Sequence, residues 1–522
     1  MYDILIRGAE IYDGTGGKPF TADVGIRDGR IICIGTQEPA AAKQVVDARG
    51  MCLLPGFIDA HTHSDVVIRN HHDRAEALRQ GITTEILSSC GIGIVPMTGS
   101  GQQDYVRSIR AVVGEPQNLE GIDSVGSYFD VVGNAATNYA QQAAHCPIRI
   151  GAVGNRDISI GKDEMAAMET LAHRTFEEGA CAFSTGLAYF PCAFSNTEEL
   201  VRLCCVAREH GVPFTIHQRS VVNRHFPNGI DPLGEAFEIA RKSGVHLHLS
   251  HYKTRKSSVG KVEEVVRPIE EGLSEGLHIT ADFYPYPVGC GQISVFLPAW
   301  VMDGSTGDAL ARMADPKLRN RILSDMEKDP GKLADGRFSS APKHPQYLGR
   351  SFEEVAQANG ERVSEMLLRF LLEEELDGGY IPHMDFGEAV LAQFRADYSQ
   401  LIQKPYYMLG SDTLPLQDRV HPRTVDTFPK MLRVAREHGV ALETMANRLS
   451  DAPARVFGLE NRGRIAPGFH ADLLLFNKEG SFIEDRPEMV FVNGVCKLHG
   501  NVLAPELTGQ GIRHKGYYKN RK

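Results

Sequence analysis

The sequence predicts an α/β protein: a TIM-type (β/α)8 barrel with a small β-sandwich domain built from both chain ends. Two observations predict the barrel. Short apolar runs alternate with helical stretches through the middle of the chain, which is typical of βα units and a parallel sheet. Eight such runs occur, the number of strands that closes this barrel. A third observation predicts the β-domain, because alternating strands broken by turn residues occur only in the first fifty residues and near the end.

The two chain ends share this β-rich pattern. Asp28-Gly29 and Asn493-Gly494 are both turn signals. The strands are expected in Asp3–Arg7, Asp23–Arg27, Arg30–Ile34, Gly463–Asn477 and Met489–Val495. We therefore expect residues 1–54 and 456–522, the C-terminal tail included, to supply the two parts of one small β-domain. Residues 55–455 between them would form the barrel.

The eight apolar runs are expected to be the barrel strands. In chain order they are Cys52–His61, Thr83–Ser89, Ile148–Val153, Ala180–Thr185, Pro213–His217, Val245–His251, His278–Phe283 and Tyr406–Ser411. The connection between the seventh and eighth is much longer than the others, with charged helical patterns and loop signals at about residues 300–400. An insertion there would lie over the C-terminal face of the barrel, either as a lid or substrate-pocket subdomain or as a purely structural elaboration.

The composition excludes several classes of protein. Of 522 residues, 42% are hydrophobic and 23% are charged, which is ordinary for globular proteins and argues against disorder or a coiled coil. A net charge of −10 provides no basic surface for nucleic acid. No stretch of about 18 apolar residues occurs, so no membrane span is expected. The start of the chain lacks signal-peptide features and the ten cysteines are scattered, so we expect a cytoplasmic protein.

Side chains of the kinds that bind metal stand at the ends of five expected strands. They are His61, His63, Cys90, His217, His251 and Asp412. One residue separates His61 from His63, so an extended strand would turn both side chains to the same side. Imidazole, thiolate and carboxylate are ligands that zinc prefers, and this barrel gathers its chemistry at the C-terminal ends of its strands. One histidine after an apolar run is more often structural, but six such residues at strand ends predict a zinc site.

The segments that carry these residues form a series of motifs. Pro55-Gly56-Phe57-Ile58-Asp59-Ala60-His61-Thr62-His63, which follows an N-terminal β-segment, resembles the signature of the amidohydrolase superfamily. Ser89-Cys90-Gly91 and Ser184-Thr185-Gly186-Leu187 narrow the resemblance to the N-acyl-D-amino-acid deacylases, also called D-aminoacylases. Later segments that agree are Ser250-His251-Tyr252-Lys253, Asp282-Phe283-Tyr284-Pro285-Tyr286, Gly410-Ser411-Asp412 and His421-Pro422-Arg423. The resemblance covers nearly the whole chain.

The resemblance implies a zinc-dependent hydrolase that converts N-acyl-D-amino acids into a carboxylate and a free D-amino acid. Its tight Zn²⁺ would be held by Cys90, His217 and His251. A second, weaker position would be surrounded by His61, His63 and Asp412. Zinc acidifies water to a pKa of about 7 and polarises an amide carbonyl. Asp412 is the expected base, which takes the proton of the attacking water and returns it to the leaving amine.

The expected substrate is a small molecule with a carboxylate, which calls for cationic or hydroxyl partners. Lys253, Tyr284 and Arg423 occupy motifs that contact the substrate in the family, with Tyr189 nearby. Cys90 would take the place of the carbamylated lysine that bridges the metals in many superfamily relatives, since the third and fourth expected strands contain no lysine.

Three departures from the family concern the pocket. In one of them, Ile216-His217-Gln218-Arg219-Ser220 keeps the ligand His217 but alters its neighbours. Gly154-Asn155-Arg156-Asp157 follows the third expected strand, where relatives usually have a Gly-His-Gly type segment. Pro287-Val288-Gly289-Cys290-Gly291 replaces a Ser-Thr stretch that helps to bind the substrate carboxylate. Hydrolysis of an amide or a related C–N bond is therefore a firmer expectation than the preference for D-amino acids.

Two other interpretations stay open. A cyclic amide or imide hydrolase of the hydantoinase or dihydroorotase kind would share the barrel and the His61-Thr62-His63 motif, although the missing lysine and the Ser89-Cys90-Gly91 motif argue against it. A non-catalytic barrel scaffold would be expected to lose metal ligands, and this chain keeps all six candidates.

Overall fold

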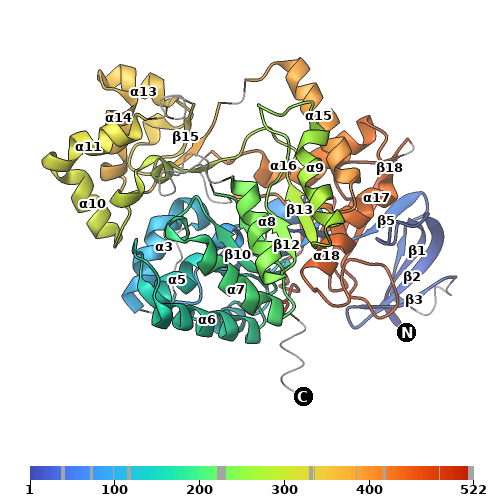
Figure 1. Cartoon of the computed structure of the whole chain (residues 1–522). Coiled ribbons are helices and arrows are strands. Elements are labelled where there is room, and N and C mark those ends of the chain that lie inside the picture. Colours follow the sequence, from blue (N-terminus) through green and yellow to red (C-terminus); the bar gives the residue numbers. More distant parts are fainter. Residues whose placement is uncertain are drawn as a thin grey trace.

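The two chain ends lie in one sheet of ten strands within the computed structural model, which describes residues 1–522 except 37–41, 71–73, 98, 115–118, 220–230, 329–332, 334, 384, 415–418, 481 and 515–522. The strands are β1 (Tyr2–Ile11), β2 (Phe20–Arg27), β3 (Arg30–Ile34), β4 (Ala42–Asp47), β5 (Met51–Pro55), β18 (Leu473–Glu479), β19 (Phe482–Ile483), β20 (Met489–Val492), β21 (Val495–His499) and β22 (Val502–Leu503). Antiparallel pairing of β5 with β18 joins the two ends directly. Figure 1 shows the blue N-terminal strands at one end of the molecule, beside red C-terminal elements.

The middle of the chain forms a ring of parallel strands. They are β6 (Phe57–Asp59), β7 (Ile82–Leu87), β8 (Asn138–Gln141) continued by β9 (Ala143–Ala144), β10 (Phe183–Gly186), β11 (Phe214–His217), β12 (Leu247–Leu249), β13 (Ile279–Phe283) and β17 (Tyr407–Leu409). Parallel pairing makes two arcs, β6-β7-β8 and β9-β10-β11-β12-β13-β17. The arcs meet at both seams, where Cys181 N–H donates to the Gln141 carbonyl and Asp412 N–H donates to the His61 carbonyl, each at 2.8 Å. With β8 and β9 as one strand, the described residues contain the eight strands of the predicted barrel.

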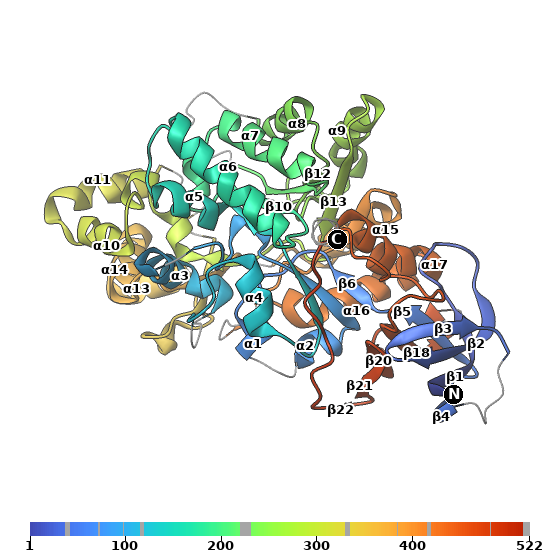
Figure 2. The same ribbon diagram turned by 90° about the horizontal axis from the view of Figure 1, so that it is seen from below.

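Helices cover the outside of the ring (Figure 2). They include α3 (Gly99–Val113), α4 (Val125–Val132), α5 (His145–Val153), α6 (Lys162–Glu177), α7 (Thr197–Glu209), α8 (Pro232–Ser243), α9 (Val262–Ser274), α15 (Glu388–Gln403) and α16 (Arg423–Glu437). Local sequence sets their ends: the Asn196 side chain caps α7, and Asp231 caps α8 with Pro232 in the first turn. Within the described part of the chain, no helix has the length and apolarity needed to cross a membrane.

The third expected strand was wrong. Residues 148–153 belong to α5, and the third barrel strand is β8, ten residues earlier. A short apolar run does not separate a buried strand from one face of a helix, and Pro147 stands in the first turn of α5, where no N–H is needed. The true strand contains Asn138 and Gln141, which are buried and hydrogen-bonded to Thr83 and Ser88. Because β8 is polar, it does not stand out as an apolar run in the sequence.

The first expected strand is two strands. The run Cys52–His61 divides at Gly56, with β5 in the sheet of the chain ends and β6 in the barrel. Gly56 is needed at this junction because a Cβ atom there would lie 2.1 Å from Thr83 Oγ1.

The long connection between β13 and β17 builds a module with its own core. Its main elements are β14 (Gly291–Gln292), α10 (Thr306–Ala314), α11 (Pro316–Met326), β15 (Arg337–Ser340), α13 (Phe352–Asn359), α14 (Val363–Glu373) and β16 (Gly379–Ile381). The ring centroid of Phe338 lies 4.8 Å from those of both Phe352 and Phe370, at the centre of a separate apolar cluster. Figure 1 shows the yellow helices of this module grouped to one side of the barrel.

The C-terminal segment returns from the end sheet to the barrel (Figure 2). Gly509 bridges Ala135, and Gly511 bridges Tyr139 on β8. Gly509 allows this approach, because a Cβ atom there would lie 2.1 Å from the Thr137 carbonyl oxygen. The segment therefore ties the end of the chain to the third barrel strand.

Candidate metal centre and substrate pocket

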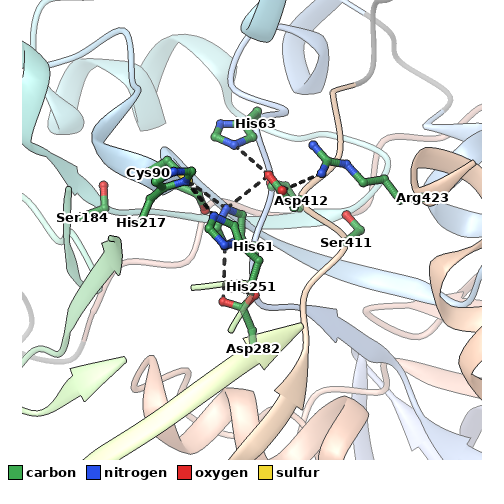
Figure 3. A network of polar contacts seen from close by, with 12 residues as sticks. His61, His63, Cys90, Ser184, His217, His251, Asp282, Ser411, Asp412 and Arg423 are labelled. Carbon is green, nitrogen blue, oxygen red and sulfur yellow. Dashed lines mark hydrogen bonds and ion pairs between the residues drawn. The ribbon is translucent and has the colours of Figure 1, made fainter. Parts of the chain in front are cut away.

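The six predicted metal ligands converge at the C-terminal ends of the barrel strands (Figure 3). They are His61 and His63 after β6, Cys90 after β7, His217 at the end of β11, His251 after β12 and Asp412 after β17. Their ligand atoms form two groups, and within each group all atoms lie within 4.8 Å of one another. One group is His61, His63, Cys90 and Asp412, and the other is Cys90, His217 and His251. Cys90 belongs to both.

The second of these groups is compact. His217 Nδ1 lies 2.8 Å from His251 Nε2, and Cys90 Sγ lies 3.7 Å from each of these nitrogens. Burial lowers the pKa of His217 to about 3 and that of His251 well below its ordinary value. Both rings are therefore neutral near pH 7, the form in which imidazole binds a metal.

Asp412 organises the other group. Its Oδ1 lies 3.5 Å from His61 Nε2 and 3.3 Å from His63 Nε2, and its Oδ2 lies 2.7 Å from Arg423 Nη1. Burial alone would raise the pKa of Asp412, but Arg423 and the hydrogen bond with His63 hold it well below its ordinary value. The carboxylate is therefore ionised at the centre of the cluster.

The electrostatics of the cluster favour a cation at the position where the two groups of candidate ligands meet. Burial opposes protonation of His61, yet Cys90 and Asp282 raise its pKa well above the ordinary value. Burial also raises the pKa of the Cys90 thiol, so a strong cation is needed to hold it as a thiolate. His63 Nδ1 is buried and has no hydrogen-bond partner among the described residues. A thiol, four imidazoles and a carboxylate gathered in this way fit a zinc ion.

Three of the six residues have left-handed backbone conformations. The φ angles are 56° for Cys90, 40° for His251 and 52° for Asp412. Such conformations cost roughly 1–2 kcal/mol for a residue other than glycine, so the surrounding structure must hold them. At Cys90, Gly91 N–H donates to Ser184 Oγ at 3.2 Å, and Ser184 Oγ–H donates to the Ser88 carbonyl at 2.5 Å. Strand β10, which lies beyond β8 and β9 in the barrel, thus fixes the turn that carries the thiol.

A cavity of about 810 Å³ opens over the cluster. His217, His251 and Asp412 lie on the side toward the barrel. The module between β13 and β17 supplies an apolar wall, which includes Phe296, Leu297, Trp300, Met326 and Leu333. The insertion therefore lines the pocket, as the first of its two sequence interpretations expects.

The four predicted substrate residues all line this cavity, but their polar groups are engaged differently. Lys253 Nζ donates to the carbonyls of Tyr284 and Tyr286 at 3.0 and 2.5 Å, and it lies 3.2 Å from the Tyr284 ring centroid. Arg423 pairs with Asp412, with its Cζ 4.8 Å from the Tyr284 ring centroid. The Tyr189 ring packs edge-on against His217, with centroids 4.9 Å apart.

One predicted departure from the family is also corrected. Gly154–Asp157 follows α5 and not a barrel strand. The true third strand ends at Ala144, and His145-Cys146 follow it, so this position keeps a histidine. His145 is buried, with Nε2 2.9 Å from Glu199 Oε1 and Nδ1 2.9 Å from Thr185 Oγ1. The departure at residues 287–291 does line the cavity.

Sequence reasoning missed several polar residues of the site. Arg255 and Lys256 line the cavity as exposed cations, and in the described residues neither has an acidic partner within ion-pair distance. Asp282 lies beneath His61 and is fully buried. The spacing of Asp282 was an available signal, since Thr280 and Asp282 alternate with apolar residues on one strand.

A family model described as the amidohydrolase family matches residues 44–496, most of the chain. The chain belongs to the amidohydrolase family. This amidohydrolase is 28% identical over 492 residues to a D-aminoacylase of Alcaligenes xylosoxydans xylosoxydans, a match that covers 91% of this chain and 88% of the relative.

Two solved structures resemble this amidohydrolase along its whole length. One is a D-aminoacylase with a binuclear metal centre: identity is 25%, the TM-score is 0.78, and 98% of this chain and 100% of that chain are covered. The other is an N-acyl-D-glutamate deacylase from Bordetella bronchiseptica, complexed with zinc and a phosphonate that mimics the tetrahedral intermediate. Here identity is 26%, the TM-score is 0.78, and 98% of this chain and 99% of that chain are covered.

Proposed function

We propose that this amidohydrolase uses zinc to hydrolyse the amide bond of N-acyl-D-amino acids, giving a carboxylate and a free D-amino acid. The observation that carries the proposal is the pair of metal-binding groups that share Cys90 and that present His217, His251 and Asp412 to the cavity. The relatives support it, because one is a D-aminoacylase and another is an N-acyl-D-glutamate deacylase that binds zinc.

The tight zinc would be held by Cys90, His217 and His251, with His61, His63 and Asp412 around a second, weaker position. When bound, zinc supplies a Lewis acid that acidifies water and polarises the amide carbonyl. The solved D-aminoacylase supports unequal sites, since it is described by one-metal activation and second-metal attenuation.

Asp412 would move the proton. It is ionised, it lines the cavity, and its Oδ1 faces the metal cluster while its Oδ2 is held by Arg423. A carboxylate in this position can take a proton from the attacking water and give it to the leaving amine, which departs poorly without it. Arg423 limits the carboxylate to one orientation, because an arginine contact is directional.

The substrate carboxylate would bind beside Gly289. A Cβ atom on Gly289 would lie 2.7 Å from the Tyr284 hydroxyl and 2.8 Å from Arg423 Nη1, so these two donors converge on one small space. Lys253 uses two of its three N–H groups on backbone carbonyls and mainly holds Tyr284 in place. Arg255 adds positive charge at the cavity, which favours an anionic substrate.

We also propose that the enzyme acts in the cytoplasm. The support is the sequence, in which ten cysteines are scattered without the dense spacing of a disulfide framework, a pattern that suits a reducing compartment.

The test of the proposed function is amine release by zinc-loaded enzyme from matched N-acetyl-D- and N-acetyl-L-amino acids. The Asp412→Asn variant serves as the blank, because it should keep the tight zinc and lose the proton carrier. Turnover confined to the D series would establish the proposal. Equal turnover of both series, or none with zinc shown to be bound, would contradict the D-amino-acid assignment and direct the search to cyclic amides.

A further inference from the structure

Asp282 connects the two groups of metal-binding side chains from below. It lies on β13, with 0% of its surface exposed. Its Oδ2 lies 3.3 Å from His61 Nδ1, and its Oδ1 accepts a hydrogen bond from the backbone N–H of His251 at 2.9 Å. Figure 3 shows Asp282 below His61, with the contact drawn. One carboxylate thus contacts one candidate ligand from each group.

The contact with His61 determines which ring nitrogen faces the cluster. An ionised carboxylate can only accept hydrogen bonds, so the Nδ1–H group of His61 must donate a hydrogen bond to Asp282. His61 Nε2, which lies 3.3 Å from Cys90 Sγ and 3.5 Å from Asp412, is then the nitrogen directed at a metal. A carboxylate behind a metal-binding histidine orients the ring in this way and raises its basicity as a ligand.

The contact with His251 supports a strained backbone. His251 has a φ of 40°, a left-handed conformation that is unfavourable for histidine. The hydrogen bond from its N–H to Asp282 fixes the peptide group at this point. Without it, the His251 ring would lose the position that puts Nε2 2.8 Å from His217 Nδ1.

Asp282 is itself held by a chain of hydrogen-bond donors. His248 Nε2 lies 2.9 Å from Asp282 Oδ2, and His248 Nδ1 lies 2.8 Å from Thr280 Oγ1. Thr280 Oγ1 in turn lies 2.9 Å from His246 Nε2. Every donor finds an acceptor when His246 donates to Thr280, Thr280 donates to His248 and His248 donates to Asp282. His248 is fully buried, whereas Thr280 and His246 at the far end of the chain are half-buried.

We propose that Asp282, held by His248, is a positioning residue that sets the geometry of both halves of the metal cluster through His61 Nδ1 and the His251 N–H. This inference rests on the proposed zinc site and adds to it. It gives a function to a buried carboxylate that touches neither the cavity nor the substrate.

The test compares zinc affinity in four variants of the full chain, by competition with a chromophoric chelator. Asp282→Asn should bind zinc about 10- to 100-fold more weakly than wild type, the usual effect of losing such a partner. His248→Leu should bind more weakly as well, whereas His248→Gln, which keeps an N–H donor, should stay close to wild type. Asp397→Asn is the matched control, because Asp397 is a buried carboxylate that contacts Gly260 and Gln393 instead.

Cobalt substitution gives a second readout that does not depend on turnover. In Asp282→Asn the thiolate-to-cobalt absorption from Cys90 should shift or weaken, and in Asp397→Asn it should not. Wild-type zinc affinity and an unchanged cobalt spectrum in Asp282→Asn would overturn the inference. If Asp282→Asn does not fold, equal affinities of His248→Leu and His248→Gln would overturn it instead. Failure of the wild-type chain to bind either metal would contradict the proposed function itself, and this inference with it.

Discussion

The metal cluster and the cavity wall opposite it are built in different ways. Every ligand candidate lies on a barrel strand or within a few residues of its end, and hydrogen bonds to other barrel strands fix the turns at Cys90 and His251. The wall comes from a module with a separate core, inserted between β13 and β17. The barrel thus holds the candidate metal ligands. The shape of the pocket is set by a part that can change without disturbing the chemistry.

The largest expected effect is at the cluster itself. Cys90→Ser should lose bound zinc and reduce activity to background, because Cys90 belongs to both ligand groups and a serine hydroxyl is a poor zinc ligand. Zinc per chain and turnover are measured together. Cys181→Ser is the control, since Cys181 is an equally buried thiol outside the cluster. Near-normal zinc in purified Cys90→Ser would refute the ligand assignment.

Asp412→Asn separates metal binding from proton transfer. It should keep zinc in the tight site and reduce kcat by about 10²- to 10⁴-fold, the usual contribution of a general base. Asp325→Asn changes a carboxylate of the same cavity on the wall side, where Asp325 accepts from Trp300 Nε1, and should leave kcat nearly unchanged. Full activity of Asp412→Asn would exclude Asp412 as the base. Equal losses of kcat in Asp412→Asn and Asp325→Asn would contradict the expected difference between the cluster and the wall.

A smaller effect is expected where the cluster meets the pocket. Gly289→Ala would crowd the space between the Tyr284 hydroxyl and Arg423 Nη1, so KM should rise about tenfold with little change in kcat or zinc content. Gly291→Ala is a matched control two residues away, because a Cβ atom there would meet Tyr380 at an ordinary 3.5 Å. An unchanged KM in Gly289→Ala would move the carboxylate site elsewhere, with Arg255 the next candidate.

The smallest effect is expected on the wall. Trp300→Leu should change KM by less than about tenfold, and by different factors for substrates with small and large apolar groups. Zinc content and kcat for a small substrate should match the wild type. A loss of bound zinc in this variant would show that the wall and the cluster are coupled and do not act independently.

The sequence was informative where chemistry and strand ends coincide. Each of the six candidate ligands was predicted because a residue of a metal-binding type ended an apolar run, and the structure brings these six side chains together as the barrel predicts. The end sheet was predictable for a similar reason, since alternation and turn residues are local signals.

The rest depended on long-range contacts. The polar residue Asn138 of strand β8 hydrogen-bonds Asp472, which directly precedes β18 of the end sheet and is 334 residues away. Asp282 gave no sign that His61 would lie above it, since 221 residues separate them. The engagement of Lys253 with the carbonyls of Tyr284 and Tyr286 likewise follows from how two strand ends approach each other.

Trp300 has one further consequence. It is the only tryptophan of the chain, and it lies in the cavity wall with Arg321 Cζ 4.1 Å from its ring centroid. All tryptophan emission of the molecule therefore originates beside the pocket. Entry of a ligand can be followed as quenching or a spectral shift without any attached dye, and Trp300→Leu provides the dark blank. Trp300 is therefore an intrinsic fluorescent probe of whether the pocket is occupied.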